Sequence, residues 1–122
     1  MQKEIYSKEY LCEQIVQSKL FIDAHFSSNI RLEDIAAKAF LSKFHFIRLF
    51  KKIYGKTPYQ YLIAVRVRHA KELLQTGMTV NEVCFSIGFD SATTFAGLFR
   101  KMTGLSPVLY RRKKSNFEEP VV

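Results

Sequence analysis

The chain contains one sequence unit twice, and this repeat limits its possible folds more than any other feature. Shifting residues Phe40–Tyr61 by 49 positions places them on Phe89–Tyr110 with nine identities. The identities pair Phe40 with Phe89, Ser42 with Ser91, Phe46 with Phe95, Leu49 with Leu98, Phe50 with Phe99, Lys52 with Lys101, Gly55 with Gly104, Pro58 with Pro107 and Tyr61 with Tyr110. Because most of these are periodic apolar residues or turn formers, the sequence predicts one backbone unit that occurs twice.

Each copy has the pattern of a helix, a turn, a second helix and a glycine turn. In the second copy, Thr79 and Glu82 form a predicted capping box, and Gly88 ends the first helix. Ser91 caps the second helix and Gly104 ends it. Its predicted core stripe follows the i, i+3, i+4, i+7 rule and consists of Phe95, Leu98, Phe99 and Met102.

The first copy repeats this pattern with one weak point. Arg31 occupies the cap position of its first helix, where a positive charge opposes the helix dipole. Ser42 caps its second helix. The predicted core residues are Leu32, Ile35, Ala36 and Ala39 on the first helix and Phe46, Leu49, Phe50 and Ile53 on the second.

Two longer helices complete the prediction. One runs from Ser7 to about Phe26 and supports the first unit. The other links the two units, because Thr57 and Pro58 open it and Gly77 closes it. We therefore expect an all-α fold of about seven helices, in which two helix-turn-helix subdomains are joined by a long linking helix. The expected parts are residues 1–57, the linking helix 58–76, the second unit with a basic end 77–114, and a frayed tail 115–122.

The charge distribution indicates a polyanionic partner. The formal net charge is +8, and the segment from Arg31 to Lys114 holds 16 Lys or Arg against 5 Asp or Glu. A basic body of this kind is typical of nucleic-acid binding but also occurs without it. The sequence contains no run long enough to span a membrane and no signal peptide, so we expect a cytoplasmic, nucleoid-associated protein without a membrane partner.

The two cysteines give no support for a metal site. Cys12 and Cys84 have neither the spacing of zinc ligands nor a nearby histidine pair, so we expect buried free thiols. The sequence also lacks paired carboxylates in an apolar setting, a Ser/His/Asp arrangement and a phosphate-cradling glycine loop. We therefore predict no enzymatic activity, no metal and no cofactor.

The chain resembles the DNA-binding domain of the AraC/XylS family of transcription regulators from about Leu11 to Arg112. The resemblance rests on the segments LEDIAAKAFLSKFHFIRLFKKIYGKTPYQYL, RVRHAKELL and VNEVCFSIGFDSATTFAGLFRKMTGLSPVLYRR. It implies sequence-specific binding to double-stranded DNA in bacterial transcription regulation, with two homeodomain-like recognition helices in successive major grooves. Many members carry a further effector-binding or dimerisation domain, so this chain is either a small stand-alone regulator or part of a longer one. We expect a monomer in the first case, with a dimer allowed in the second, and RNA polymerase is a candidate partner.

The expected base-reading residues lie on the second helix of each unit. The resemblance places base contacts at Phe44, Ile47 and Arg48 in the first unit. Arg48 suits a bidentate contact with guanine, while the apolar pair suits thymine methyl groups, unless it belongs to the core. In the second unit Thr93 and Ala96 are the matching candidates. Gly97 stands where family members usually carry a longer side chain, which leaves open whether it permits close approach of DNA or of a neighbouring helix.

Other cations are better suited to phosphates than to bases, because flexible charged groups fix position without reading sequence. A solvated surface is the alternative for several of them, and His45 is more typical of a packed histidine than of a base reader. The predicted phosphate contacts are Lys43, Lys51, Lys52, Arg68, Arg100, Lys101, Arg111 and Arg112.

A second function remains open at this point. Gly97 and the apolar Ile47 are also compatible with a helical protein-interaction module that binds DNA only nonspecifically. The ratio of specific to random-site affinity distinguishes the two, whereas salt dependence does not.

Overall fold

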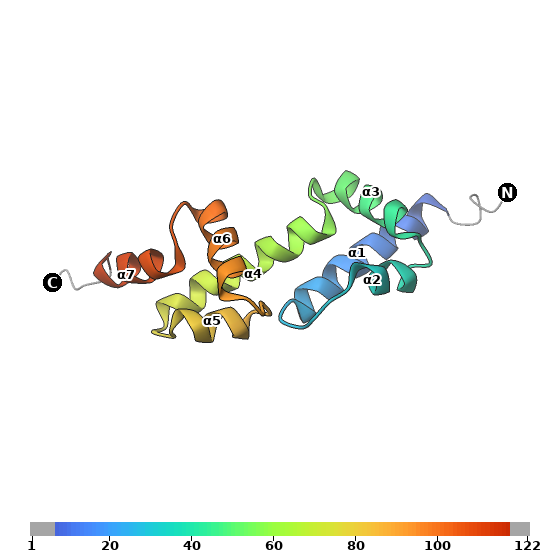
Figure 1. Ribbon diagram of the computed structural model, residues 1–122. Helices are drawn as coiled ribbons and strands as arrows, with labels where there is room; N and C mark the ends of the chain where they lie inside the picture. Colours follow the sequence, from blue (N-terminus) through green and yellow to red (C-terminus); the bar gives the residue numbers. More distant parts are fainter. Residues whose placement is uncertain (1–6, 118–122) are drawn as a thin grey trace. The chain divides into compact units, whose positions relative to one another are not determined.

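The computed structural model describes the backbone of residues 7–117 and the side chains of residues 7–113. All regular secondary structure in this part of the chain is α-helix (Figure 1). The helices are α1 Lys8–His25, α2 Leu32–Lys38, α3 Lys43–Tyr54, α4 Pro58–Gln75, α5 Val80–Ser86, α6 Ala92–Thr103 and α7 Pro107–Phe117. The predicted all-α class with about seven helices is therefore confirmed over the described residues.

The chain divides into two compact units after Leu62, inside helix α4. The first unit holds α1, α2, α3 and the first turn of α4, and the second holds the rest. The expected division treated residues 58–76 as a separate linking helix, whereas the boundary between the two compact units lies within α4, after Leu62. The expected frayed tail began at residue 115, whereas α7 continues to Phe117. Residues 118–122 lie outside the described residues.

Side-chain caps fix the helix starts, as the sequence predicts. Ser42 Oγ accepts from the His45 N–H at 3.1 Å, and Ser91 Oγ accepts from the Thr94 N–H at 3.2 Å. Thr79 and Glu82 form the expected reciprocal capping box. Arg31 stands at the start of α2 without a side-chain cap, so this end lacks the stabilisation that the starts of α3, α5 and α6 receive.

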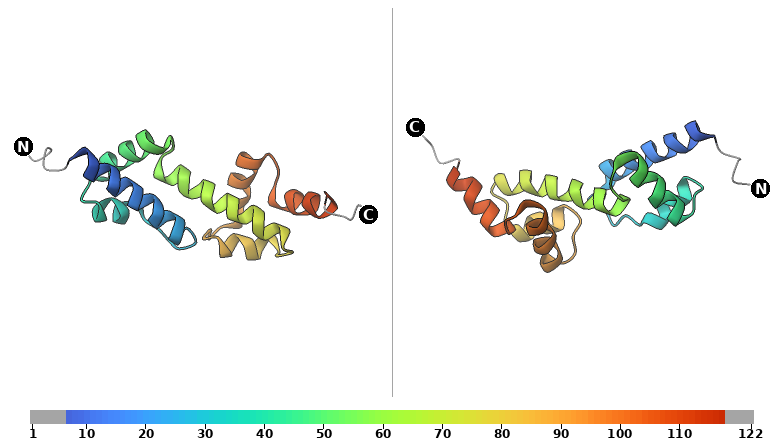
Figure 2. Two further views of the ribbon diagram at one scale, coloured as in Figure 1. Left: turned by 180° about the vertical axis from the view of Figure 1, so that it is seen from behind. Right: turned by 90° about the horizontal axis from the view of Figure 1, so that it is seen from above.

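The first unit is built around α3, which packs against α1 and α2 (Figure 2). Phe46 and Phe50 are fully buried, with ring centroids 5.9 Å apart, and Tyr61 from α4 lies 5.8 Å from Phe50. The buried cluster consists of Ile15, Ile22, Ile35, Ala36, Phe46, Phe50 and Leu62. Aromatic contacts between α3 and α4, together with aliphatic side chains of α1 and α2, therefore set the position of α3.

The second unit repeats this aromatic arrangement. Phe95 and Phe99 are fully buried with centroids 5.7 Å apart, and Tyr110 from α7 lies 5.4 Å from Phe99. The match to Phe46, Phe50 and Tyr61 shows that the sequence repeat is a structural repeat. Cys84 is buried in this unit, and desolvation raises the pKa of its thiol, with a smaller contribution from Asp90.

Three expected burials are wrong. Ile53 is 39% exposed and Met102 is 48% exposed. Each lies in the last turn of its helix, where the helical repeat has drifted, and in the first unit Tyr54 packs on Phe50 instead, at 5.0 Å. Cys12 is exposed rather than buried, although it lies only three residues from the buried Ile15 on α1.

The pairing of Phe40 with Phe89 is also wrong in structural terms. Helices α2 and α5 begin 48 residues apart, at Leu32 and Val80, whereas α3 and α6 begin 49 residues apart, at Lys43 and Ala92. The second turn is therefore one residue longer, and the shift of 49 holds only after the turn.

Hydrogen bonds fix the correct register of the turn. The Leu41 N–H donates to the Ala36 carbonyl at 3.0 Å, and the Phe89 N–H donates to the Cys84 carbonyl at 3.1 Å, so Leu41 corresponds to Phe89. Phe40 then corresponds to Gly88, and these two residues have φ of 60° and 100°. Phe40 is an exposed, non-glycine residue in the left-handed conformation that glycine adopts in the other unit.

Candidate nucleic-acid interface

Helix α3 presents a mixed apolar and basic surface opposite its buried phenylalanines. Phe44, Ile47, Arg48 and Lys51 share this side by their i, i+3, i+4, i+7 spacing. Phe44 is 73% exposed, so its alternative assignment to the core is excluded. Ile47 is half-buried and Arg48 is exposed, so an apolar patch lies beside a planar donor. Such a surface can contact a thymine methyl group and a guanine edge together.

The cations of α3 fall into two groups. Arg48, Lys51 and Lys52 are exposed, and no ion pair holds them within the described part of the chain. Lys43, in contrast, lies 3.1 Å from Glu33 of helix α2. This partner was not predicted from the sequence, because the two residues are ten positions apart and meet only across the turn. Three of the four cations are therefore available to an incoming anion.

Helix α6 presents a smaller and less polar surface. Thr93, Arg100 and Lys101 are exposed and Ala96 is half-buried. A Cβ atom built on Gly97 would meet nothing within 4 Å, so no neighbouring helix in the described part of the chain requires a glycine here. Close approach of a helix is thereby excluded as the reason for Gly97, and close approach of an external backbone remains.

The linking helix carries two arginines with different environments. Arg68 is exposed, as a phosphate contact requires. Arg66 is 8% exposed and places its guanidinium 5.3 Å from the Phe89 ring centroid, where it helps to hold the turn between α5 and α6.

Arg111 has an internal contact that the sequence did not predict. Its guanidinium donates to the Gly77 carbonyl at 2.9 Å, and its buried Nε has no hydrogen-bond partner. This contact joins α7 to the turn after α4, so the residue is positioned to stabilise the second unit. Arg112 is exposed. Of the two arginines predicted to contact the DNA backbone here, Arg111 is bonded within the protein and Arg112 is exposed.

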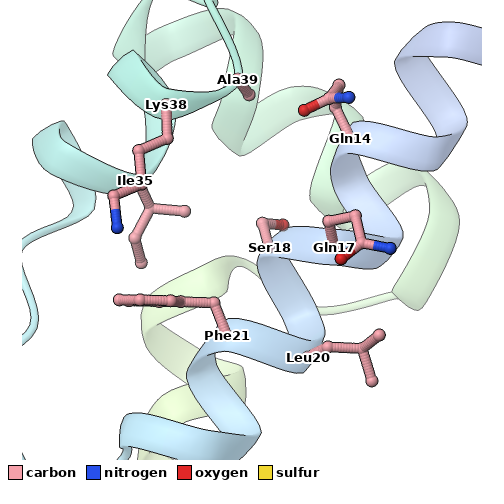
Figure 3. A pocket seen from close by; sticks show the side chains of 8 residues that line it. All are labelled: Gln14, Gln17, Ser18, Leu20, Phe21, Ile35, Lys38 and Ala39. Atoms are coloured by element: carbon pink, nitrogen blue, oxygen red, sulfur yellow. The ribbon is translucent and has the colours of Figure 1, made fainter.

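A groove on the first unit lies between α1 and α2 (Figure 3). Its volume is about 360 Å³, and it is lined by Gln14, Gln17, Ser18, Leu20, Phe21, Ile35, Lys38 and Ala39. The Lys38 ammonium lies 4.4 Å from the Phe21 ring centroid. None of the predicted DNA-contacting residues lines this groove, so we do not assign it to the interface.

Two other kinds of site are absent from the described residues. No group of three or more His, Cys, Asp or Glu side chains there could hold a metal ion. None of the helices in residues 7–117 combines the length and hydropathy that a membrane crossing requires.

Comparison with known proteins gives consistent matches. A family model for a helix-turn-helix domain matches residues 35–113. The chain is 36% identical over 94 residues to the MmsAB operon regulatory protein of Pseudomonas aeruginosa, covering 76% of this chain and 31% of that protein. It is 33% identical over 115 residues to the transposon Tn10 TetD protein of Escherichia coli, covering 93% of this chain and 83% of that protein.

A solved structure extends the similarity to a complex with DNA. The DNA-binding domain of AdpA, described as a global transcriptional factor and solved with a target DNA, has a TM-score of 0.80 and 31% identity. The match covers 87% of this chain and 97% of that one. The chain spans between 31% and 47% of the length of the first three curated relatives.

Proposed function

The chain belongs to the AraC/XylS family of transcription regulators, and from this premise we propose that its first helix-turn-helix unit selects the DNA sequence while the second mainly contributes backbone contacts. The chain binds double-stranded DNA sequence-specifically in transcription regulation, as its family does. The proposal adds that the first unit selects the sequence and the second unit mainly contacts the DNA backbone.

The observation that carries this proposal is the contrast between α3 and α6. Arg48 is exposed beside the exposed Phe44 and has no ion-pair partner among the described residues, whereas the position 49 residues later is Gly97. A bidentate arginine contact discriminates bases by about 1–3 kcal/mol, and a glycine has no side chain with which to do so. Arg100 and Lys101 suit phosphates, so shape and backbone contacts carry the contribution of the second unit.

The chain binds as a monomer to one asymmetric site in this proposal, because it already holds two recognition units. The two helices enter successive major grooves about 34 Å apart. The phosphate contacts come from Lys43, Lys51, Lys52, Arg68, Arg100, Lys101 and Arg112. We place the protein at the chromosome in the cytoplasm, assign it no catalytic role, and keep RNA polymerase as a candidate partner.

Selection of bound sequences from a random duplex library tests the proposal. The expected result is an asymmetric motif whose strongest positions cluster in one half and include a G·C pair. Repeating the selection with Arg48→Ala should weaken that pair, while Arg112→Ala, a matched loss of one exposed guanidinium, should leave the motif unchanged. A palindromic motif contradicts monomeric binding, and an empty selection favours the protein-interaction module with nonspecific DNA binding.

A further inference from the structure

Glu33 and Lys43 form an ion pair that joins the first turns of α2 and α3. Lys43 Nζ donates to Glu33 Oε2 at 3.1 Å, and the two side chains are 44% and 55% exposed. The pKa of the Glu33 carboxyl is lowered, first by a hydrogen bond from its own backbone and then by Lys43, so the group is ionised near neutral pH. The Glu33 carboxylate therefore partly neutralises Lys43, a residue that we expect to contact a DNA phosphate.

The second unit has no equivalent pair. With the register that the turn hydrogen bonds define, Glu33 corresponds to Asn81 and Lys43 corresponds to Ala92. The turn between α5 and α6 therefore forms without an ion pair at these two positions. The pair in the first unit is thus an addition to the fold rather than a requirement of it.

An exposed ion pair is weak enough to be exchanged. Such pairs contribute about 0.2–1 kcal/mol in water, whereas a lysine that neutralises a DNA phosphate also releases a condensed counterion. Lys43 can therefore leave Glu33 for a phosphate. The exchange leaves an unpaired carboxylate beside a polyanion, which opposes binding.

We propose that Glu33 is an affinity-limiting residue that competes with the DNA phosphate for Lys43. The inference rests on the proposed function, since it requires that α3 docks on DNA. Glu33 lowers affinity through Lys43 and not merely as one more negative charge. Its neighbour Asp34 provides the matched control, because it lies in the same turn of α2, is also exposed, and forms no ion pair within the described residues.

The test is a set of binding isotherms on a selected duplex and on a random duplex at one fixed salt concentration. The proteins are the unmodified chain, Glu33→Gln, Asp34→Asn, Lys43→Ala and the double variant Glu33→Gln/Lys43→Ala. Both carboxylate variants lose one negative charge, so a general electrostatic effect raises their affinities equally. We expect Glu33→Gln to bind about 1.4- to fivefold more tightly than Asp34→Asn, which is the range that an exposed pair allows.

The double variant separates the two mechanisms further. Lys43→Ala should lose more affinity in the Glu33→Gln background than in the unmodified chain. In the Glu33→Gln background the Lys43 ammonium has no carboxylate partner to leave before it binds DNA. Equal affinities for Glu33→Gln and Asp34→Asn overturn the inference, as does an identical loss from Lys43→Ala in both backgrounds. If the chain binds selected and random duplexes equally, the proposed function fails instead, so the two failures are distinguishable.

Discussion

Replacing Phe40 by glycine is expected to stabilise the first unit. Phe40 has φ of 60° in the turn between α2 and α3, and its side chain is 71% exposed. A non-glycine residue pays about 1–2 kcal/mol in this region, because its Cβ approaches the following carbonyl oxygen. Glycine removes that strain but gives the unfolded chain more freedom, which offsets about 0.4–1 kcal/mol. Since little apolar surface of Phe40 is buried, the expected net gain is about 0.5–1 kcal/mol.

Chemical denaturation followed by far-ultraviolet circular dichroism measures the effect, with thermal unfolding as a second readout. A gain of this size corresponds to a rise of about 2–8 °C in Tm for a unit of this length. The control is Phe40→Ala, which also removes the ring but keeps a Cβ in the left-handed conformation. It should show no gain.

The reciprocal change is made in the second unit. Gly88 has φ of 100° at the corresponding position, so Gly88→Ala should destabilise that unit by about 1 kcal/mol or more. If Phe40→Gly is no more stable than Phe40→Ala, the left-handed conformation carries no strain, and the correspondence of Phe40 with Gly88 loses its energetic meaning.

Three further predictions concern other residues. Gly97→Ala should raise stability by up to about 1 kcal/mol, because its Cβ meets open space; unchanged DNA affinity in the same variant would show that no DNA backbone lies against this position. Tyr61→Phe should destabilise the first unit by about 1.5 kcal/mol, because the Tyr61 hydroxyl donates to the Asp23 carboxylate. Burial first and then the hydrogen bond to Asp23 raise the pKa of Tyr61. The stability from this hydroxyl is therefore present below pH 10 and is lost as pH rises through the raised pKa. A difference in unfolding free energy between the two proteins that stays constant up to pH 12 would contradict this. Arg111→Met should lower Tm because it removes the bond to the Gly77 carbonyl, whereas Arg112→Ala should chiefly reduce the salt dependence of DNA binding; the reverse pattern would return Arg111 to the interface.

Features set by neighbouring residues were predictable from the sequence. The helix starts followed from Ser42, Thr79 and Ser91, because a cap is a contact between residues three positions apart. The buried phenylalanines followed from helical periodicity. The exposed position of Arg48 followed from the same periodicity, since it lies opposite the apolar stripe.

Features set by the turn or by distant contacts were not predictable in the same way. The identity of Phe40 and Phe89 suggested an unbroken repeat, but the extra residue in the second turn shows only in backbone hydrogen bonds. The Glu33–Lys43 pair joins residues 10 positions apart and the Arg111–Gly77 bond joins residues 34 positions apart, so no local sequence pattern predicts either contact. Ile53 and Met102 show that an apolar residue at the end of a stripe need not be covered.

The ratio of affinities for a selected and a scrambled duplex, measured for the unmodified chain and for Arg48→Ala at one salt concentration, tests the central claim most directly. Specific binders typically prefer their site by about 10³-fold or more, so we expect at least this ratio for the unmodified chain. Arg48→Ala should reduce it by about five- to 150-fold, the equivalent of one lost bidentate base contact, while affinity for the scrambled duplex falls far less. Equal losses on both duplexes would show that Arg48 touches only phosphate and would contradict sequence selection by the first unit.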